Sequence, residues 1–161
     1  MEKKAQGWGF DLVVASIIFS FAIVFFYIFA INYSTVGEEN FNNLAYEGQL
    51  AAESILSEGY PADWNNNTVV RIGILSQNKI NQTKLERFYN MANSSEYNRT
   101  KVLFNIAHDY NVSFSSNVTI PGVGDVSSIG KTKSNPENLI RVTRFCIYNN
   151  KPITLDIDVS G

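Results

Sequence analysis

The strongest constraint on this chain is a run of 20 residues, Leu12 to Ile31, that contains no charge and no proline. Lys3 and Lys4 precede the run, and one acidic residue, Asp11, lies at its edge. At ~1.5 Å per residue, a helix of this length covers ~30 Å, the thickness of a bilayer hydrocarbon core. Such a helix also satisfies its own backbone polar groups in lipid. We therefore predict a transmembrane helix over residues 6–33.

The positive charges around this run are unevenly distributed. Lys3 and Lys4 stand before it, and no further lysine or arginine follows until Arg71. Because basic residues favour the cytoplasmic side, we expect a cytoplasmic N-terminus and an extracellular body. A cleavable secretory signal is the alternative, but its apolar core usually spans ~7–15 residues and ends in a small-x-small site. This run ends Phe29-Ala-Ile-Asn-Tyr33, which favours a single-pass anchor.

The composition excludes several classes of function. The formal net charge is −2, so the chain has no basic excess with which to bind nucleic acid. Cys146 is the only cysteine, which excludes an intramolecular disulfide and predicts a buried strand residue. His108 is the only histidine, with no cysteine or carboxylate pair near it in sequence. We therefore expect no metal, no cofactor and no enzyme; a membrane-anchored hydrolase would lack a nucleophile and base pair.

Residues 34–58 continue the helix with an amphipathic pattern. Apolar residues recur there at intervals of three and four, with glutamates between them, which is typical of a helix with one buried face. Gly59 and Pro61 then predict its end. The residues of the apolar face are Phe41, Leu44, Ala45, Ala52, Ile55 and Leu56.

Residues 59–161 form the predicted head. Short strands are expected at 68–75, 111–120, 139–148 and 153–159, with helical turns around residues 85–89 and 102–103 and a flexible loop at 121–138. In the last strand, Ile153, Leu155, Ile157 and Val159 alternate with polar residues, so one face is covered and the other is wet. The two aspartates on the wet face, Asp156 and Asp158, are expected to be solvated rather than catalytic. The predicted fold is α+β: a long N-terminal helix packed on a small antiparallel β-sheet head with short helices.

Asparagine provides a second signal of an extracellular head. Random placement of 19 Asn and 23 Ser plus Thr predicts roughly 2.7 Asn-x-Ser/Thr sites, and seven are present. The alternative is turn chemistry, because these residues also bond their own backbone at bends. We expect glycosylation at several of six sites, since the seventh, Asn32, adjoins the membrane. The six are Asn66, Asn81, Asn93, Asn98, Asn111 and Asn117.

Three residues of the apolar helix carry possible roles in assembly. Asp11 suits the N-cap of the helix, where a carboxylate accepts from unpaired N–H groups, or it pairs with a cation of a neighbouring molecule. Ser16 and Ser20, four residues apart, form a small-residue seam that lets another helix approach closely.

The segment Lys3-Lys4-Ala5-Gln6, the nearby acidic residue and the apolar helix that continues into a head resemble the type IV pilin superfamily, especially its archaeal members. The resemblance implies a class III signal peptide, residues 1–5, that a leader peptidase removes after Ala5, leaving Gln6 as the new N-terminus. It also implies that Asp11 neutralises the amine of an adjacent subunit. Asp11 is the sixth residue counted from Gln6, where the family usually has its acidic residue fifth, and Ala5 stands where glycine is more frequent.

The resemblance implies a surface subunit that assembles through its apolar helix into a pilus-like filament or its assembly platform. The implied partners are the membrane, copies of the chain or related pilin subunits, the leader peptidase, and a secretion ATPase with its platform proteins. The alternative is a monomeric, membrane-anchored adhesin or receptor-like module held by the same helix. That alternative predicts an uncleaved N-terminus and no role for Asp11 in assembly.

Overall fold

The computed structural model of this chain describes the backbone of residues 3–131 and 133–161, and the side chains of residues 9–31, 40–131 and 133–161. The chain divides into two units, residues 1–40 and 41–161. Helix α1 (Lys3–Ile55) contributes to both, which confirms the prediction of one long helix through the apolar and amphipathic stretches.

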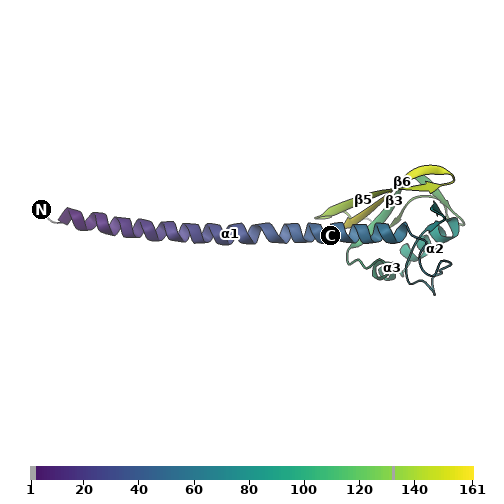
Figure 1. The fold of residues 1–161 in the computed structure, drawn as a ribbon, viewed down its shortest axis with the longest axis horizontal. Coiled ribbons are helices and arrows are strands. Elements are labelled where there is room, and N and C mark those ends of the chain that lie inside the picture. The colour runs from purple at the N-terminus through teal and green to yellow at the C-terminus, as the bar shows by residue number, and fades with distance from the viewer. Residues whose placement is uncertain (1–2, 132) are drawn as a thin grey trace. The chain divides into compact units, whose positions relative to one another are not determined.

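The head, residues 41–161, contains a six-stranded sheet with helices on one face (Figure 1). The strand order is β1-β2-β5-β6-β3-β4, and every pair is antiparallel except β2 with β5. This arrangement confirms the predicted α+β class. The strands are β1 (Leu75–Ser76), β2 (Lys79–Ile80), β3 (Asp109–Ile120), β4 (Gly124–Gly130), β5 (Leu139–Tyr148) and β6 (Lys151–Ser160).

The longest antiparallel pair is the β5–β6 hairpin, which joins the strands that the sequence predicts at 139–148 and 153–159. Asn149 and Asn150 form its two-residue turn with φ of 48° and 61°, left-handed values that asparagine tolerates. The alternating pattern of β6 is also confirmed. Leu155, Ile157 and Val159 have no exposed surface, whereas the polar residues between them are half-buried on the opposite face.

The helices cover the buried face of the sheet. Helix α2 (Gln82–Ala92) begins at Asn81, whose side chain accepts from the Lys84 N–H, and α3 (Tyr97–Phe104) ends at Asn105 in the left-handed conformation. At Gly48 of α1, an added Cβ would lie 2.9 Å from the Val142 side chain of β5, so the glycine permits close packing of helix on sheet. One core joins these elements; its helical members include Leu44, Ala52, Ile55, Leu85, Phe88, Met91 and Phe104.

The predicted end of α1 is displaced. The helix stops at Ile55 rather than at residue 58, and Ser57 closes its last turn by donating to the Ser54 carbonyl at 2.6 Å. Gly59 does adopt a left-handed φ of 72°, four residues beyond the helix end. Phe41, expected on the buried face, is 55% exposed.

Two other predictions are wrong. Residues 68–74 are not a strand: they form a turn and an isolated bridge between Tyr60 and Arg71, and only Leu75 begins β1. This segment is instead held by the buried Trp64, whose Nε1 donates to the Gly73 carbonyl at 2.9 Å. The loop expected at 121–138 contains strand β4, which pairs with β3 at the edge of the sheet.

Candidate assembly surface on the N-terminal helix

The stretch of α1 from Gly9 to Ile31 is long and apolar enough to cross a membrane once. None of it is buried by the described part of the chain. A signal sequence near an N-terminus has the same property, so the observation establishes a candidate membrane helix and not its orientation. Its most exposed large side chains include Phe10, Leu12, Phe19, Phe25 and Phe26, at 66–74%.

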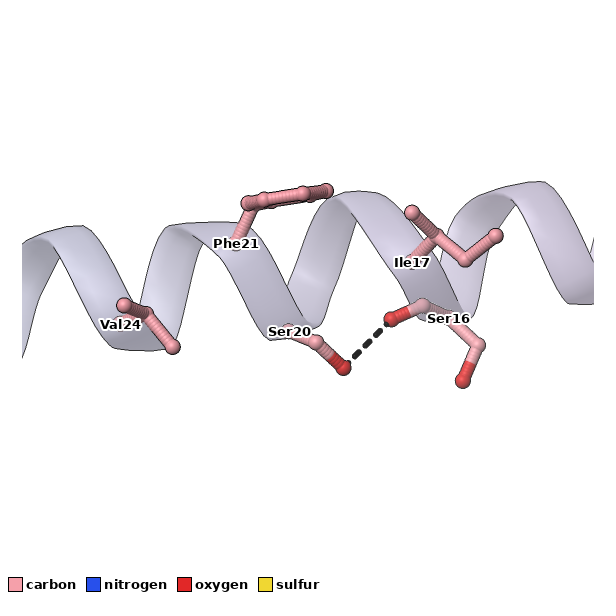
Figure 2. Close-up of a pocket in the computed structure, with 5 residues that line it drawn as sticks. All are labelled: Ser16, Ile17, Ser20, Phe21 and Val24. Carbon is pink, nitrogen blue, oxygen red and sulfur yellow. Dashed lines mark hydrogen bonds between the residues drawn. The ribbon is translucent and has the colours of Figure 1, made fainter.

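A shallow groove of ≈ 280 Å³ lies on this stretch, with the two serines of the predicted seam among its lining residues (Figure 2). Ile17, Phe21 and Val24 complete the lining. The Ser20 hydroxyl donates to the Ser16 carbonyl at 2.9 Å, so its proton is used within the helix. The Ser20 hydroxyl is therefore not a free donor in this groove, which offers a close approach and an apolar wall.

Asp11 does not occupy the N-cap. Because α1 begins at Lys3, Asp11 lies inside the helix, where the neighbouring backbone N–H groups already bond within the helix. The N-cap interpretation is therefore wrong, and the pairing of Asp11 with a cation stays a prediction. The described side chains of residues 9–31 include no lysine or arginine with which its carboxylate could pair.

The helix does not bring Asp11 and the serine seam together. At ~100° per residue, Ser16 lies ~140° around the axis from Asp11, and Ser20 lies ~180° away. The carboxylate and the groove therefore face different neighbours in any bundle of such helices. The angle can be calculated from the sequence spacing, provided that Asp11 is known to lie in the same helix as the serines.

The predicted processing residues Lys3, Lys4, Ala5 and Gln6 have helical backbone, and their side chains lie outside the described part. Cleavage after Ala5 therefore stays a prediction. The sequon at Asn32 also falls outside the described side chains.

The six predicted glycosylation sites differ in accessibility. Asn93 and Asn117 are exposed, together with the hydroxyl residues of their sequons, Ser95 and Thr119. Asn66, in a turn, is half-buried and precedes the exposed Thr68.

The other three sites are less accessible, although Asn93 also makes a bond within the fold, accepting from the Gly130 N–H at 3.3 Å. Asn81 accepts from the Lys84 N–H at 3.1 Å as the cap of α2. Asn98 is exposed, but the hydroxyl residue of its sequon, Thr100, is fully buried, and Asn111 is only 9% exposed within β3.

Cys146, Asp156 and Asp158 all lie in the sheet and contact residues of the neighbouring strand. Cys146 is buried in β5, where burial raises the pKa of its thiol to about 11. Asp158 binds Arg141 through both carboxylate oxygens at 2.6 and 2.8 Å, and Asp156 accepts from Thr143. Among the described residues, no cluster of three His, Cys, Asp or Glu side chains could hold a metal ion.

One contact that the sequence analysis missed joins α1 to the loop before β3. Glu47 Oε2 accepts from the His108 N–H at 3.1 Å and lies 3.0 Å from His108 Nδ1. The two residues are 61 positions apart in the sequence, so no local sequence pattern could have predicted their contact. His108 itself lies in the loop before β3.

The chain matches no known family, no curated protein and no solved structure with which it was compared. The combination of an apolar N-terminal helix with a β-sheet head is compatible with a pilin-like fold.

Proposed function

We propose that this chain is a pilin-like surface subunit that assembles through the apolar part of α1, with its head outward. The observation that carries the proposal is the uncovered apolar surface from Gly9 to Ile31, with one carboxylate, Asp11, inside the helix. A helix that is apolar on every side is as stable among copies of itself as it is in lipid. Assembly then exchanges one apolar environment for another.

Asp11 supports an assembled state over a monomeric anchor. A carboxylate near the membrane entry is costly unless it is solvated or paired, and it is no longer explained as a cap. Cleavage after Ala5 would create an amine on Gln6, close in sequence to Asp11, which a neighbouring subunit could present to this carboxylate. The groove at Ser16 and Ser20, on the other side of the helix, would accept a second neighbour.

The deciding experiment replaces Asp11 with asparagine in the full chain, in a host that supplies the secretion machinery. We expect Asp11→Asn to remain in the membrane fraction and to lose filaments, or chemically cross-linked multimers, by at least tenfold. Glu53→Gln is the matched control, because Glu53 is an exposed carboxylate on the same helix, within the head. Unchanged assembly of Asp11→Asn would favour the monomeric adhesin or receptor-like module.

The mature N-terminus tests the processing step separately. Mass spectrometry of the purified protein should find a chain that begins at Gln6. A chain that begins at Met1 or Glu2 would contradict leader cleavage. It would also remove the Gln6 amine that is proposed to pair with Asp11.

The glycosylation sites test the orientation of the head. If the head is extracellular in a host with N-glycosylation, Asn93→Gln and Asn117→Gln should each remove one glycan mass, because both sequons are exposed. Asn111→Gln should remove none, because Asn111 is 9% exposed. A chain without any glycan in such a host would count against an outward head.

A further inference from the structure

Strand β5 has an open edge. Its inner side pairs with β6 from Leu139 to Tyr148, whereas its other side meets β2 only at Ile147, opposite Lys79. Among the described residues, no other strand pairs with this side between Leu139 and Phe145.

The main-chain groups of alternate residues point out of this edge. Thr154, which lies opposite Phe145, directs its N–H away from β5, toward Ser115 of β3 at 2.9 Å. The Phe145–Thr154 pair is therefore of the non-hydrogen-bonded type, and Phe145 directs its own N–H and C=O to the open side. By the period of two, Leu139, Arg141 and Thr143 do the same. Within the described chain, only the Thr143 carbonyl has a partner there, the Arg144 guanidinium at 3.1 Å.

The side chains of these residues do not protect the edge. Leu139 is 50% exposed and Phe145 is 80% exposed, on the same face of the sheet. Natural edges are commonly protected by charged side chains. Here the charge of Arg141 is held on its own sheet by the two bonds to Asp158.

We infer that this edge pairs with the same edge of a second copy, in an antiparallel register that places Val142 opposite Val142. In that register Leu139 faces Phe145 of the other copy, so both exposed apolar side chains are covered. Arg141 faces Thr143, and Arg144 faces Ile140, so no like charges meet. Each outward N–H and C=O lies opposite a complementary group, because all four outward residues pair with outward residues.

The neighbouring registers are less favourable. A slip of two residues in one direction places Arg141 opposite Arg141, which is destabilising. A slip in the other direction places Arg141 opposite Phe145 and moves Leu139 against Ile147, which β2 already covers. The sequence of the edge therefore specifies one symmetric register, as a two-fold interface between identical surfaces requires.

The opposite edge of the sheet is a poorer partner. Strand β4 has seven residues, with glycines of positive φ at both ends, Gly124 at 104° and Gly130 at 113°. Its pairing with β3 is also interrupted between Ser113 and Val118. Such irregularity is a common protection against edge pairing. This asymmetry favours β5 with β5 over a head-to-tail contact of β5 with β4.

The pairing is a contact different from the proposed filament, because copies of α1 that run parallel in one bundle are not related by this two-fold rotation. The two-fold rotation keeps both α1 segments on one face of the joined sheet and reverses their direction. Phe41, where α1 enters the head, then lies at opposite ends of the pair.

The test uses cysteine pairs in the full chain, purified in detergent, with Cys146→Ala as the background. In the inferred register Leu139 and Phe145 of different copies lie ~5.5 Å apart, whereas two copies of either residue lie six residues, ~20 Å, apart. A thiol cross-linker that reaches less than ~10 Å should therefore link a mixture of Leu139→Cys and Phe145→Cys. We expect at least tenfold more dimer from the mixture than from either variant alone.

Two controls make the result decisive. Thr143→Pro removes an outward N–H, and proline is tolerated at edges, so it should abolish cross-linking while near-ultraviolet circular dichroism stays unchanged. A mixture of Leu139→Cys and Ser128→Cys, in which Ser128 is an exposed residue of β4, should not link. Linkage of that mixture, equal linkage of the single variants, or no dimer from the Leu139→Cys and Phe145→Cys mixture would each overturn the inference.

Discussion

At the scale of single residues, Lys84 is a buried cation that binds the segment following the end of α1. It is 6% exposed, and its Nζ donates to the carbonyls of Glu58 and Leu75 at 2.8 Å each. A buried carbonyl without a partner costs about 1–3 kcal/mol. Lys84→Met leaves two such groups while it removes the desolvation cost of the ammonium, so we expect a loss of about 2–4 kcal/mol.

Chemical denaturation of the full chain in detergent, followed by near-ultraviolet circular dichroism, measures this loss. Lys151→Met is the control, because Lys151 is exposed on β6 and its replacement should change stability by less than about 0.5 kcal/mol. Equal stability of the two variants would show that the bonds of Lys84 contribute nothing net.

Tyr97 makes the head sensitive to alkaline pH. Its hydroxyl accepts from the Tyr110 N–H at 2.9 Å, and burial raises the pKa of Tyr97 from 10.0 to about 12. Below pH 10 the phenol is protonated in both the folded and the unfolded chain, so stability is complete. Between pH 10 and 12 only the unfolded chain ionises, so the free energy of unfolding falls as pH rises.

Burial also raises the pKa of Tyr110, so we expect the loss to deepen through its ionisation in the unfolded chain. Denaturation midpoints measured from pH 8 to pH 11.5 should decline mainly above about pH 10, and Tyr97→Phe should reduce the slope there. An identical slope in Tyr97→Phe would contradict this origin.

At the scale of elements, the sequence predicts best where one periodicity extends over many residues. The two-residue alternation in β6 and the length of β5 both follow from local pattern, and the structure confirms them. The long helix was also predictable, because no proline interrupts residues 3–55.

The errors arise where distant contacts override local preference. Residues 68–74 are rich in β-branched side chains, yet Trp64 and the end of α1 bind this segment and leave it outside the sheet. Conversely, residues 124–130 have a composition typical of a loop. They form strand β4 because the long strand β3 provides main-chain hydrogen-bonding partners. The side chain of Asp11 suits a cap, but the helix begins eight residues earlier, which excludes that one of its two possible roles.

Gly73 shows how closely the segment after α1 is packed. An added Cβ would lie 2.2 Å from the Gly59 nitrogen and 2.4 Å from the Ser57 carbonyl oxygen, both main-chain atoms. Because neither can move without displacing the end of the helix, Gly73→Ala should cost about 3 kcal/mol or more. Gly122→Ala is the control: its φ is +76° and nothing lies within 4 Å, so only backbone strain of about 1 kcal/mol is expected. Comparable losses in the two variants, measured by denaturation, would exclude the contact as the cause.

At the scale of the whole molecule, the candidate assembly surface was only partly predictable. The charge-free run and its serines can be read directly from the sequence. The groove forms because these small residues lie between larger side chains. That Asp11 and Ser20 lie on opposite sides of the helix could be inferred only after the helix was known to begin before Asp11. The open edge of β5 is a consequence of the strand order, and the strand order cannot be predicted from local sequence patterns.

The last prediction separates a packing role for the groove from general apolarity of the helix. Ser16→Leu and Ser20→Leu each fill the groove of ≈ 280 Å³ with a larger apolar side chain, so membrane insertion should persist or improve. If a neighbouring helix packs there, either variant should lower the yield of cross-linked multimers or sheared filaments several-fold, because the helices can no longer approach closely. Ala22→Leu adds similar apolar volume ~160° from Ser20 around the helix, on the side of Asp11. Assembly that falls equally in all three variants would show that the groove matters no more than the opposite side of the helix, and assembly that falls in none would remove the groove from the interface.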